Sequence, residues 1–175
     1  EEMIAGIGDG KIIISDYSGN KTTVPNTSKV QYLDWSPDAT KLVFSDSSNN
    51  LYIINKDGTG KTLISSEASG SVSWRIGNTV AYGYVNLVNE DGTNNQHLID
   101  GGDAQKLSSK EVVYVHNHDV YKIGTYGSSN VKLFSNYTPY TFKLSFDGQK
   151  IVGGAFGDPG IWLINIDGTG YTKIR

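Results

Sequence analysis

The sequence contains no cysteine, only four prolines and little charge. The absence of cysteine from all 175 residues excludes disulfides, thiol nucleophiles and cysteine-ligated zinc. Basic residues number 15 against 18 acidic ones, for a net charge of −3. Proteins that bind nucleic acid normally carry a basic patch or stripe, so we expect no nucleic-acid partner. No stretch approaches the ~18 consecutive apolar residues of a transmembrane helix, so we expect no membrane insertion.

Glycine, tyrosine and small polar residues make up much of the chain instead. There are 21 glycines and 11 tyrosines. Glycine reaches positive φ without steric cost, and tyrosine packs well on a pleated sheet, so this composition favours short strands joined by tight turns. Strong helix formers are not concentrated in any segment. The chain is therefore predicted to be all-β.

A unit of four strands is visible in residues 28–64. Four short runs rich in apolar and β-branched residues are separated by turn signals, and the last turn is a tight hairpin around Asp57 and Gly58. The runs cover residues 30–35, 41–45, 51–55 and 61–64. Four strands in about 36 residues are typical of one blade of a β-propeller.

The same unit recurs along the chain. Its hairpin glycines, Gly58, Gly92, Gly127 and Gly168, stand 34, 35 and 41 residues apart. With no linker between units, we predict one β-propeller domain of about five antiparallel blades, four of them with four strands. The predicted units cover about residues 1–25, 28–64, 70–99, 103–134 and 138–175.

The N-terminal unit has only three predicted strands and lacks the innermost one. Up-and-down rings normally close by combining strands from both ends of the chain in one blade, which removes exposed edges. Two interpretations remain open at this point. The chain forms a compact five-bladed ring with one thin blade, or it forms part of a longer propeller.

Two of the units resemble the TolB-like, WD-type propeller repeat. The resemblance rests on Asp-Trp-Ser-Pro-Asp at 34–38, followed by Lys-Leu-Val-Phe at 41–44 and by Asp57-Gly58, with a second match over 144–168. It implies a propeller that binds protein, often in the bacterial envelope, or one attached to a catalytic domain. Relatives include peptidase propellers and oligogalacturonate lyases, whose chemistry uses several histidines and a metal.

Few residues suit catalysis. No Gly-x-Ser-x-Gly nucleophile motif occurs, and the only histidines are His97, His116 and His118. If His116 and His118 lay on one strand, their imidazoles would share a face and could hold a metal. Because 117–119 reads more readily as a turn of solvated polar residues, we assign no catalytic, metal or cofactor residues.

Three tryptophans are predicted packing residues. Trp35 and Trp74 occupy equivalent positions in successive units, and Trp162 lies in the last unit. A position that recurs with the repeat favours packing between blades over ligand stacking.

One irregular segment is the candidate binding loop. Residues 153–160 lengthen the connection between the second and third strands of the last unit and account for much of the 41-residue spacing. Insertions in repeat proteins map to loops on one face and often bind partners. Phe156 and Asp158 are the predicted ligand-binding residues.

The sequence therefore favours a non-catalytic binding or scaffolding propeller, which presents its loops and central channel to a protein or glycan partner. The alternatives are the propeller part of an enzyme, such as a polysaccharide lyase or peptidase, and a structural repeat segment of a surface protein. The surface rich in Asn, Thr, Ser and Tyr favours an extracytoplasmic location, whether periplasmic, cell-surface or secreted.

Overall fold

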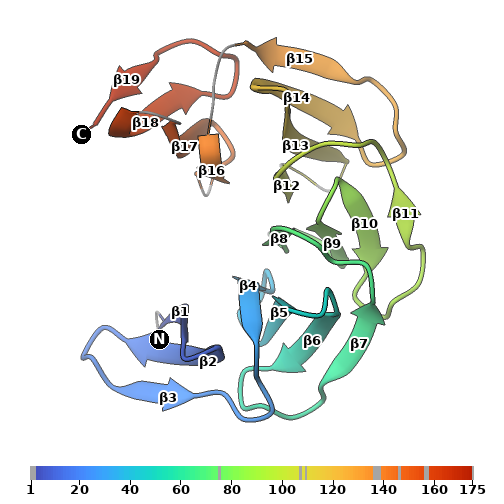
Figure 1. Ribbon diagram of the computed structural model, residues 1–175, viewed down its shortest axis with the longest axis vertical. Helices are drawn as coiled ribbons and strands as arrows, with labels where there is room; N and C mark the ends of the chain where they lie inside the picture. The colour runs from blue at the N-terminus through green and yellow to red at the C-terminus, as the bar shows by residue number, and fades with distance from the viewer. Residues whose placement is uncertain are drawn as a thin grey trace.

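The chain folds as an arc of five β-sheets (Figure 1). The computed structural model describes residues 3–74, 76–106, 108, 110–135, 139–145, 147–155 and 158–174. Within these residues every regular element is a strand. The described residues include no helix that is long and apolar enough to cross a membrane. Each sheet has its first strand towards the middle of the arc and its last towards the rim. The predicted propeller fold is confirmed.

The first blade has three strands, and the other four blades have four each. The first blade comprises β1 (Met3–Gly8), β2 (Lys11–Asp16) and β3 (Lys21–Thr23). The second comprises β4 (Val30–Trp35), β5 (Lys41–Asp46), β6 (Leu51–Asn55) and β7 (Thr62–Ser65). The third comprises β8 (Val72–Ser73), β9 (Thr79–Tyr82), β10 (Asn86–Asn89) and β11 (Gln96–His97). The fourth comprises β12 (Ala104–Lys106), β13 (Glu111–His116), β14 (Asp119–Gly124) and β15 (Val131–Phe134). The fifth comprises β16 (Pro139–Leu144), β17 (Lys150–Ala155), β18 (Asp158–Asn165) and β19 (Thr172–Lys173).

The hairpin between the third and fourth strands is held by its own side chains. In the second blade, Asn55 N–H donates to the carbonyl of Thr59 at 3.0 Å. The carboxylate of Asp57 accepts hydrogen bonds from the N–H and hydroxyl of Thr59, at 2.9 and 2.7 Å. Gly58 has φ +85°, and a Cβ there would lie 2.6 Å from Pro25 Cδ, so this turn requires glycine.

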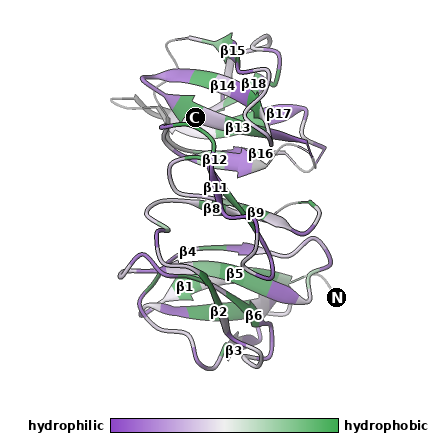
Figure 2. Cartoon of the chain, turned by 90° about the vertical axis from the view of Figure 1, so that its right-hand side faces the viewer, coloured by the Kyte–Doolittle hydropathy of each residue, from purple (hydrophilic) through white to green (hydrophobic). Residues whose placement is uncertain are grey.

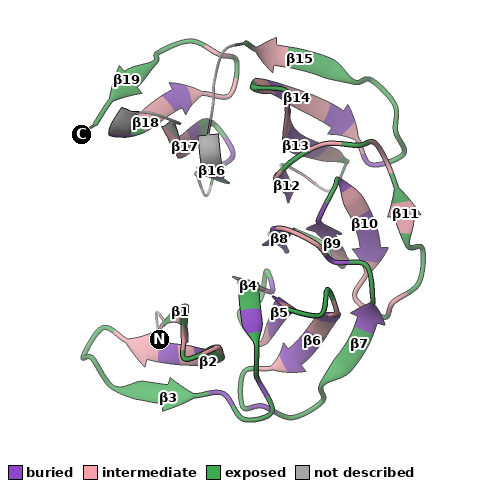
Figure 3. Cartoon of the chain, in the orientation of Figure 1, coloured by how far each residue is buried: buried purple, intermediate pink, exposed green. Residues whose placement is uncertain are grey.

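Apolar side chains fill the seams between neighbouring blades. Four buried clusters join the five blades in succession, and most of their members come from the second and third strands. Representative members, from the first seam to the fourth, are Ile12 and Phe44, Val43 and Trp74, Leu87 and Tyr114, and Val113 and Ile151. Figure 2 shows the apolar residues along these strands and the hydrophilic ones in the turns, and Figure 3 shows that β3 and β19 at the rim are exposed.

The tryptophans pack as predicted. Trp74 is only 1% exposed in the seam between the second and third blades, and its indole N–H donates to Gly77 O at 3.0 Å. Trp35 packs against the first seam and Trp162 against the fourth, both partly buried. All three tryptophans thus contribute to packing between blades.

The antiparallel order gives the propeller two faces. One face carries the turns between the first and second strands and between the third and fourth strands, such as 36–40 and 56–61. We call it the hairpin face. The opposite face carries the turns between the second and third strands and the connections between blades, such as 47–50 and 66–71. We call it the connection face.

The arc is open between its two ends. Figure 1 shows the first blade separated from the fifth, and among the described residues no buried cluster joins the two. Ile4, on the outward face of the first blade, is 58% exposed. The five described blades thus form an arc. They do not form the compact five-bladed ring that was one of the two interpretations of the sequence.

The outward face of the fifth blade repeats a face that is buried elsewhere. Leu51 stands four residues before Asn55, and Ile161 stands four residues before Asn165, at the same register position of their sheets. Leu51 is 0% exposed in the seam with the third blade, whereas Ile161 is 50% exposed. The difference between the two sites is the presence of a neighbouring blade.

Alanine substitutions at these two positions should have different costs. We expect Leu51→Ala to lower the free energy of unfolding by about 2–5 kcal/mol, because it leaves a cavity in a seam. Ile161→Ala should cost about 1 kcal/mol or less, because half of its surface already contacts water. Urea unfolding measures both values. Equal costs would mean that the fifth blade's outward face is covered in solution.

The turn before β5 depends on an ionised carboxylate. Asp38 accepts hydrogen bonds from the Ser36 hydroxyl at 2.7 Å and from the Thr40 N–H and hydroxyl at 3.1 and 2.8 Å. These bonds, led by that of Ser36, lower the pKa of Asp38 from 3.8 to about 2. Ser145 and Asp147 build the same turn in the fifth blade.

The depressed pKa predicts a loss of stability in acid. Because the folded pKa of Asp38 lies below the unfolded value, its contribution is present above about pH 4–5 and is lost as the pH falls towards 2. Asp38→Asn should therefore flatten the dependence of unfolding free energy on pH in this window. Denaturant titrations at pH 5, 4, 3 and 2 provide the test, and identical slopes for the two proteins would contradict it.

Candidate functional site

The segment predicted as a binding loop is mostly strand. β17 continues to Ala155 and β18 begins at Asp158, with Gly154 paired to Ile161 and a register shift between Gly154 and Ala155. The two strands extend because β17 and β18 keep pairing past the point where turn-forming residues suggested a loop. Phe156 lies outside the described residues, as does the side chain of Asp158, so their predicted binding role stays a prediction.

The histidine pair lies at a tight turn. β13 ends at His116 and β14 begins at Asp119, so Asn117 and His118 form a two-residue hairpin turn with φ of +47° and +67°. Positive φ at both central residues is the geometry of a type I′ turn. The predicted turn is confirmed at 117–118, and Asp119 already pairs with His116 as the first residue of β14. Because His118 is in the turn rather than on β13, the two imidazoles do not share a strand face.

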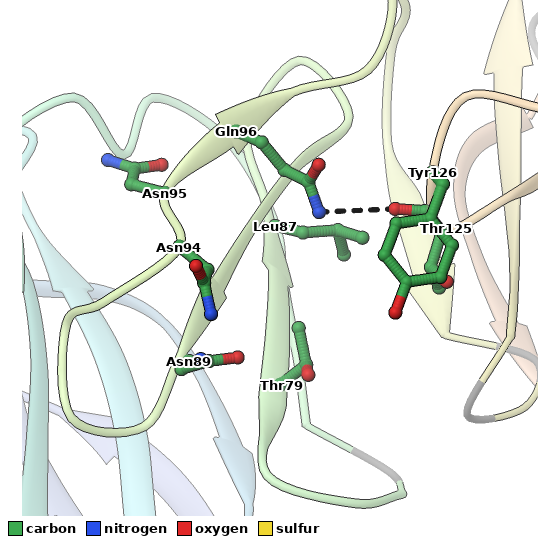
Figure 4. A pocket seen from close by; sticks show the side chains of 8 residues that line it. All are labelled: Thr79, Leu87, Asn89, Asn94, Asn95, Gln96, Thr125 and Tyr126. Atoms are coloured by element: carbon green, nitrogen blue, oxygen red, sulfur yellow. Dashed lines mark hydrogen bonds between the residues drawn. The ribbon is translucent and has the colours of Figure 1, made fainter.

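A polar pocket lies in the seam between the third and fourth blades, on the hairpin face. It has a volume of about 400 Å³. The lining residues are Thr79, Leu87, Asn89, Asn94, Asn95, Gln96, Thr125 and Tyr126 (Figure 4). Four of these eight residues are amides, two are threonines and one is a tyrosine whose side chain is freely accessible. We call it the amide pocket.

Asn94 enters the amide pocket through a departure from the repeat. The second and fifth blades have glycine at this hairpin position, Gly60 and Gly170, with φ of +63° and +66°. Asn94 adopts the same left-handed conformation, with φ +51°. Asparagine tolerates this region better than most residues with a side chain. The third blade thus carries a carboxamide where the second and fifth blades carry no side chain.

Hydrogen bonds between blades hold the pocket walls. The buried hydroxyl of Tyr82 lies 3.0 Å from the Ser65 hydroxyl and donates to Asn95 Oδ1 at 2.6 Å. Gln96 Nε2 donates to the backbone carbonyl of Thr125 at 3.1 Å, across the seam to the fourth blade. Figure 4 shows this bond beside the ring of Tyr126. These bonds fix the positions of the Asn95 and Gln96 carboxamides.

The amide pocket is electrically neutral. None of its eight lining residues is an acid, a base or a histidine. Each carboxamide both donates and accepts hydrogen bonds, and Tyr126, 88% exposed, offers an aromatic ring. The pocket thus suits a neutral ligand rich in hydroxyl groups with an apolar face for stacking. Among the described lining residues, Tyr126 is the one titratable group, and none is a carboxylate, a histidine or a lysine.

The sequence predictions did not include the amide pocket. The signal was present in Asn94-Asn95-Gln96, which replaces the Gly-Lys-Thr of the second blade, at 60–62, and the Gly-Tyr-Thr of the fifth, at 170–172. The other wall, Thr125 and Tyr126, comes from the next blade, and only the folded arrangement brings the two segments together.

The fold is shared with longer propellers of known structure. No protein-family model matches the chain, and no curated protein matches its sequence. TolB from Acinetobacter baumannii superposes with a TM-score of 0.78 at 18% identity, over 94% of this chain and 48% of that one. In its fold, the chain resembles TolB. It spans about half the length of that protein.

Other solved structures show how widely this fold is used. A chain of a nidogen/laminin complex superposes with a TM-score of 0.73 at 11% identity, over 94% of this chain and 70% of that one. An oligogalacturonate lyase in complex with manganese gives a TM-score of 0.56 at 13% identity, over 99% of this chain and 73% of that one. At such low identities, the likeness establishes the fold alone.

Replacing Asn94 by glycine should leave the fold intact. We expect Asn94→Gly to change the unfolding free energy by less than about 0.5 kcal/mol. Glycine relieves the left-handed conformation but adds freedom to the unfolded chain, so the two effects offset each other. Thermal and urea unfolding test this. A large loss of stability would mean that the carboxamide is needed for folding rather than for the pocket.

Proposed function

We propose that this propeller is a non-catalytic binding module that holds a neutral glycan in the amide pocket. The observation that carries the proposal is the uncharged set of described lining residues, in which Asn94 and Gln96 lie opposite the exposed Tyr126 (Figure 4). Sugar hydroxyls exchange hydrogen bonds with carboxamides in both directions, and the apolar face of a pyranose ring stacks on an aromatic side chain. A protein partner that presents such glycans is included in the proposal.

The binding site lies at the rim of the arc rather than along its middle. Its residues come from β9, from β10, β11 and the hairpin between them, and from the turn after β14, and β11 is an outermost strand (Figure 1). A pocket at the rim is open to one end or a short stretch of a long polymer. This favours recognition of an extended chain over enclosure of a free monosaccharide.

Two observations support binding over an enzymatic role. The described lining of the amide pocket includes no carboxylate, histidine or lysine, and the hydrogen bonds of Tyr82 to Asn95 and of Gln96 to Thr125 hold its segments in place. Glycoside chemistry uses a pair of carboxylates beside the scissile bond. Glycan binding also agrees with the extracytoplasmic location that we propose from the surface rich in Asn, Thr, Ser and Tyr.

Screening on immobilised neutral oligosaccharides tests the proposal, followed by calorimetry on the best ligand. We expect Asn94→Gly and Tyr126→Ala each to weaken the affinity about tenfold, equivalent to ~1.4 kcal/mol. The affinity of the wild-type protein should change little between low and high salt, because no charge takes part.

Tyr17→Ala is the matched control for Tyr126→Ala. Tyr17 is 72% exposed and lies in the first blade, far along the chain from the amide pocket. Its removal should leave glycan affinity unchanged. Absence of glycan binding by the wild-type protein, or equal affinities for all variants, would refute the proposal. Release of cleaved sugar during the assay would favour the enzymatic alternative instead.

A further inference from the structure

A second, smaller pocket lies at the other end of the same seam, on the connection face. It has a volume of about 120 Å³. Its lining residues are Ser69, Gly70, Gly83, Tyr84, Gly102 and Asp103. The volume is well below the ~300–1,000 Å³ of pockets that enclose drug-sized ligands, so it admits only a small head group on a slender stem.

Backbone forms the floor of this pocket because two glycines cannot be replaced. A Cβ at Gly83 would lie 2.6 Å from the carbonyl oxygen of Ser69, and Gly83 has φ +52°. A Cβ at Gly102 would lie 2.9 Å from the carbonyl oxygen of Val115. Any larger residue would therefore collide with backbone and alter the pocket.

Tyr84 is held outwards by a strained turn. Val85 N–H donates to Gly83 O at 2.9 Å, which closes a tight turn around Tyr84. Val85 is fully buried and adopts φ +58°, a conformation that is rare for a β-branched residue and costs energy. With the backbone in this turn, the Tyr84 side chain is 58% exposed and lies beside the pocket.

Among the described residues of this lining, Asp103 supplies the one charge. The buried Ser71 hydroxyl donates to its carboxylate, while Ser71 Oγ accepts the N–H of Ala104 at 3.3 Å. Burial raises the pKa of Asp103 above its usual value, and the Ser71 bond and the positive charge of Lys143 on β16 oppose that rise. The carboxylate is thus held in place, and the Ser71 bond and the Lys143 charge do not fully offset its loss of hydration.

We propose that this pocket binds the ammonium group of a lysine side chain from a partner protein. The Asp103 carboxylate supplies the opposite charge, and the Tyr84 ring supplies a cation–π contact. An ammonium is a compact charge on a slender four-carbon stem, which suits the small volume better than the broader guanidinium fork of arginine. One carboxylate in the lining is too few for a divalent metal, which needs several oxygen ligands.

The site is independent of the glycan proposal. The two pockets lie on opposite faces, and β9 separates them: Thr79 at its start lines the amide pocket, while Gly83 just after its end lines the second one. Substitutions at Asp103 or Tyr84 should therefore leave glycan affinity unchanged. Either proposal can fail without the other.

NMR titration of the ¹⁵N-labelled protein with Nα-acetyl-lysine methylamide tests the inference. We expect saturable shifts of the Gly70, Gly83, Tyr84 and Gly102 amides. The Nε-acetylated form of the same probe, which lacks the charge, should bind at least tenfold more weakly. Glucosamine carries its amine directly on a ring that does not fit the pocket, so it should also bind weakly. Glucosamine binding equal to that of the lysine probe would overturn the assignment to a protein side chain.

Variants distinguish a binding site from a structural one. Asp103→Asn keeps the acceptor for Ser71 but removes the charge, and Tyr84→Ala removes only an exposed ring; each should weaken binding of the lysine probe about tenfold. Tyr17→Ala is the control for a tyrosine exposed elsewhere and should have no effect. If Asp103→Asn does not fold, Tyr84→Ala decides alone. Unchanged affinity in the variants, shifts that map to other blades, or no saturable shift would overturn the proposal.

Discussion

Apolar packing across the seams between blades is the interaction on which the rest of the structure depends. Each blade buries side chains of its second and third strands against its neighbours, as Leu42 and Phe44 of the second blade do against the first blade. A single sheet of this size could not exclude water from both faces by itself. Because the seams supply the cohesion, the turns can be short and can form their hydrogen bonds within themselves. In the second blade, Asp57 and Thr59 then serve only to reverse the chain.

Both candidate sites arise where the third and fourth blades depart from the repeat. Asn94 replaces a hairpin glycine at one end of the seam, and the strained turn of Val85 displays Tyr84 at the other. Between these ends, the seam is a buried apolar cluster that contains Leu87 and Tyr114. The rigid middle allows each end to hold its side chains in place at low cost in conformational entropy on binding. The seam therefore combines cohesion with the two proposed binding sites.

The sequence was sufficient for the fold because the repeat carries its own redundancy. Period-two apolar runs and hairpin glycines agree from unit to unit, so strands such as β4 and β6 were predicted with the bounds that the structure gives. The sites were less accessible. The Gly-rich segment 153–160 suggested a loop, yet pairing of Gly154 with Ile161 continues the sheet. Composition indicates where turns are possible, whereas cross-strand pairing decides where they begin.

The two pockets could not be read from local sequence for a further reason. Each is completed by a residue from the next blade, Tyr126 or Asp103, at a position fixed by the angle between sheets. That angle follows from the packing of many seam side chains together. A sequence pattern could mark Asn94 as unusual, but it could not place Tyr126 opposite to it.

Native-state hydrogen exchange tests the central role of the seams most directly. If seam packing provides the cohesion, protection should be highest in β5, β6, β9, β10 and β13, which have neighbouring blades on both sides. The strands of the first and fifth blades, each with one neighbour among the described blades, should exchange faster although their own ladders are complete. Uniform protection across all five blades would contradict this account.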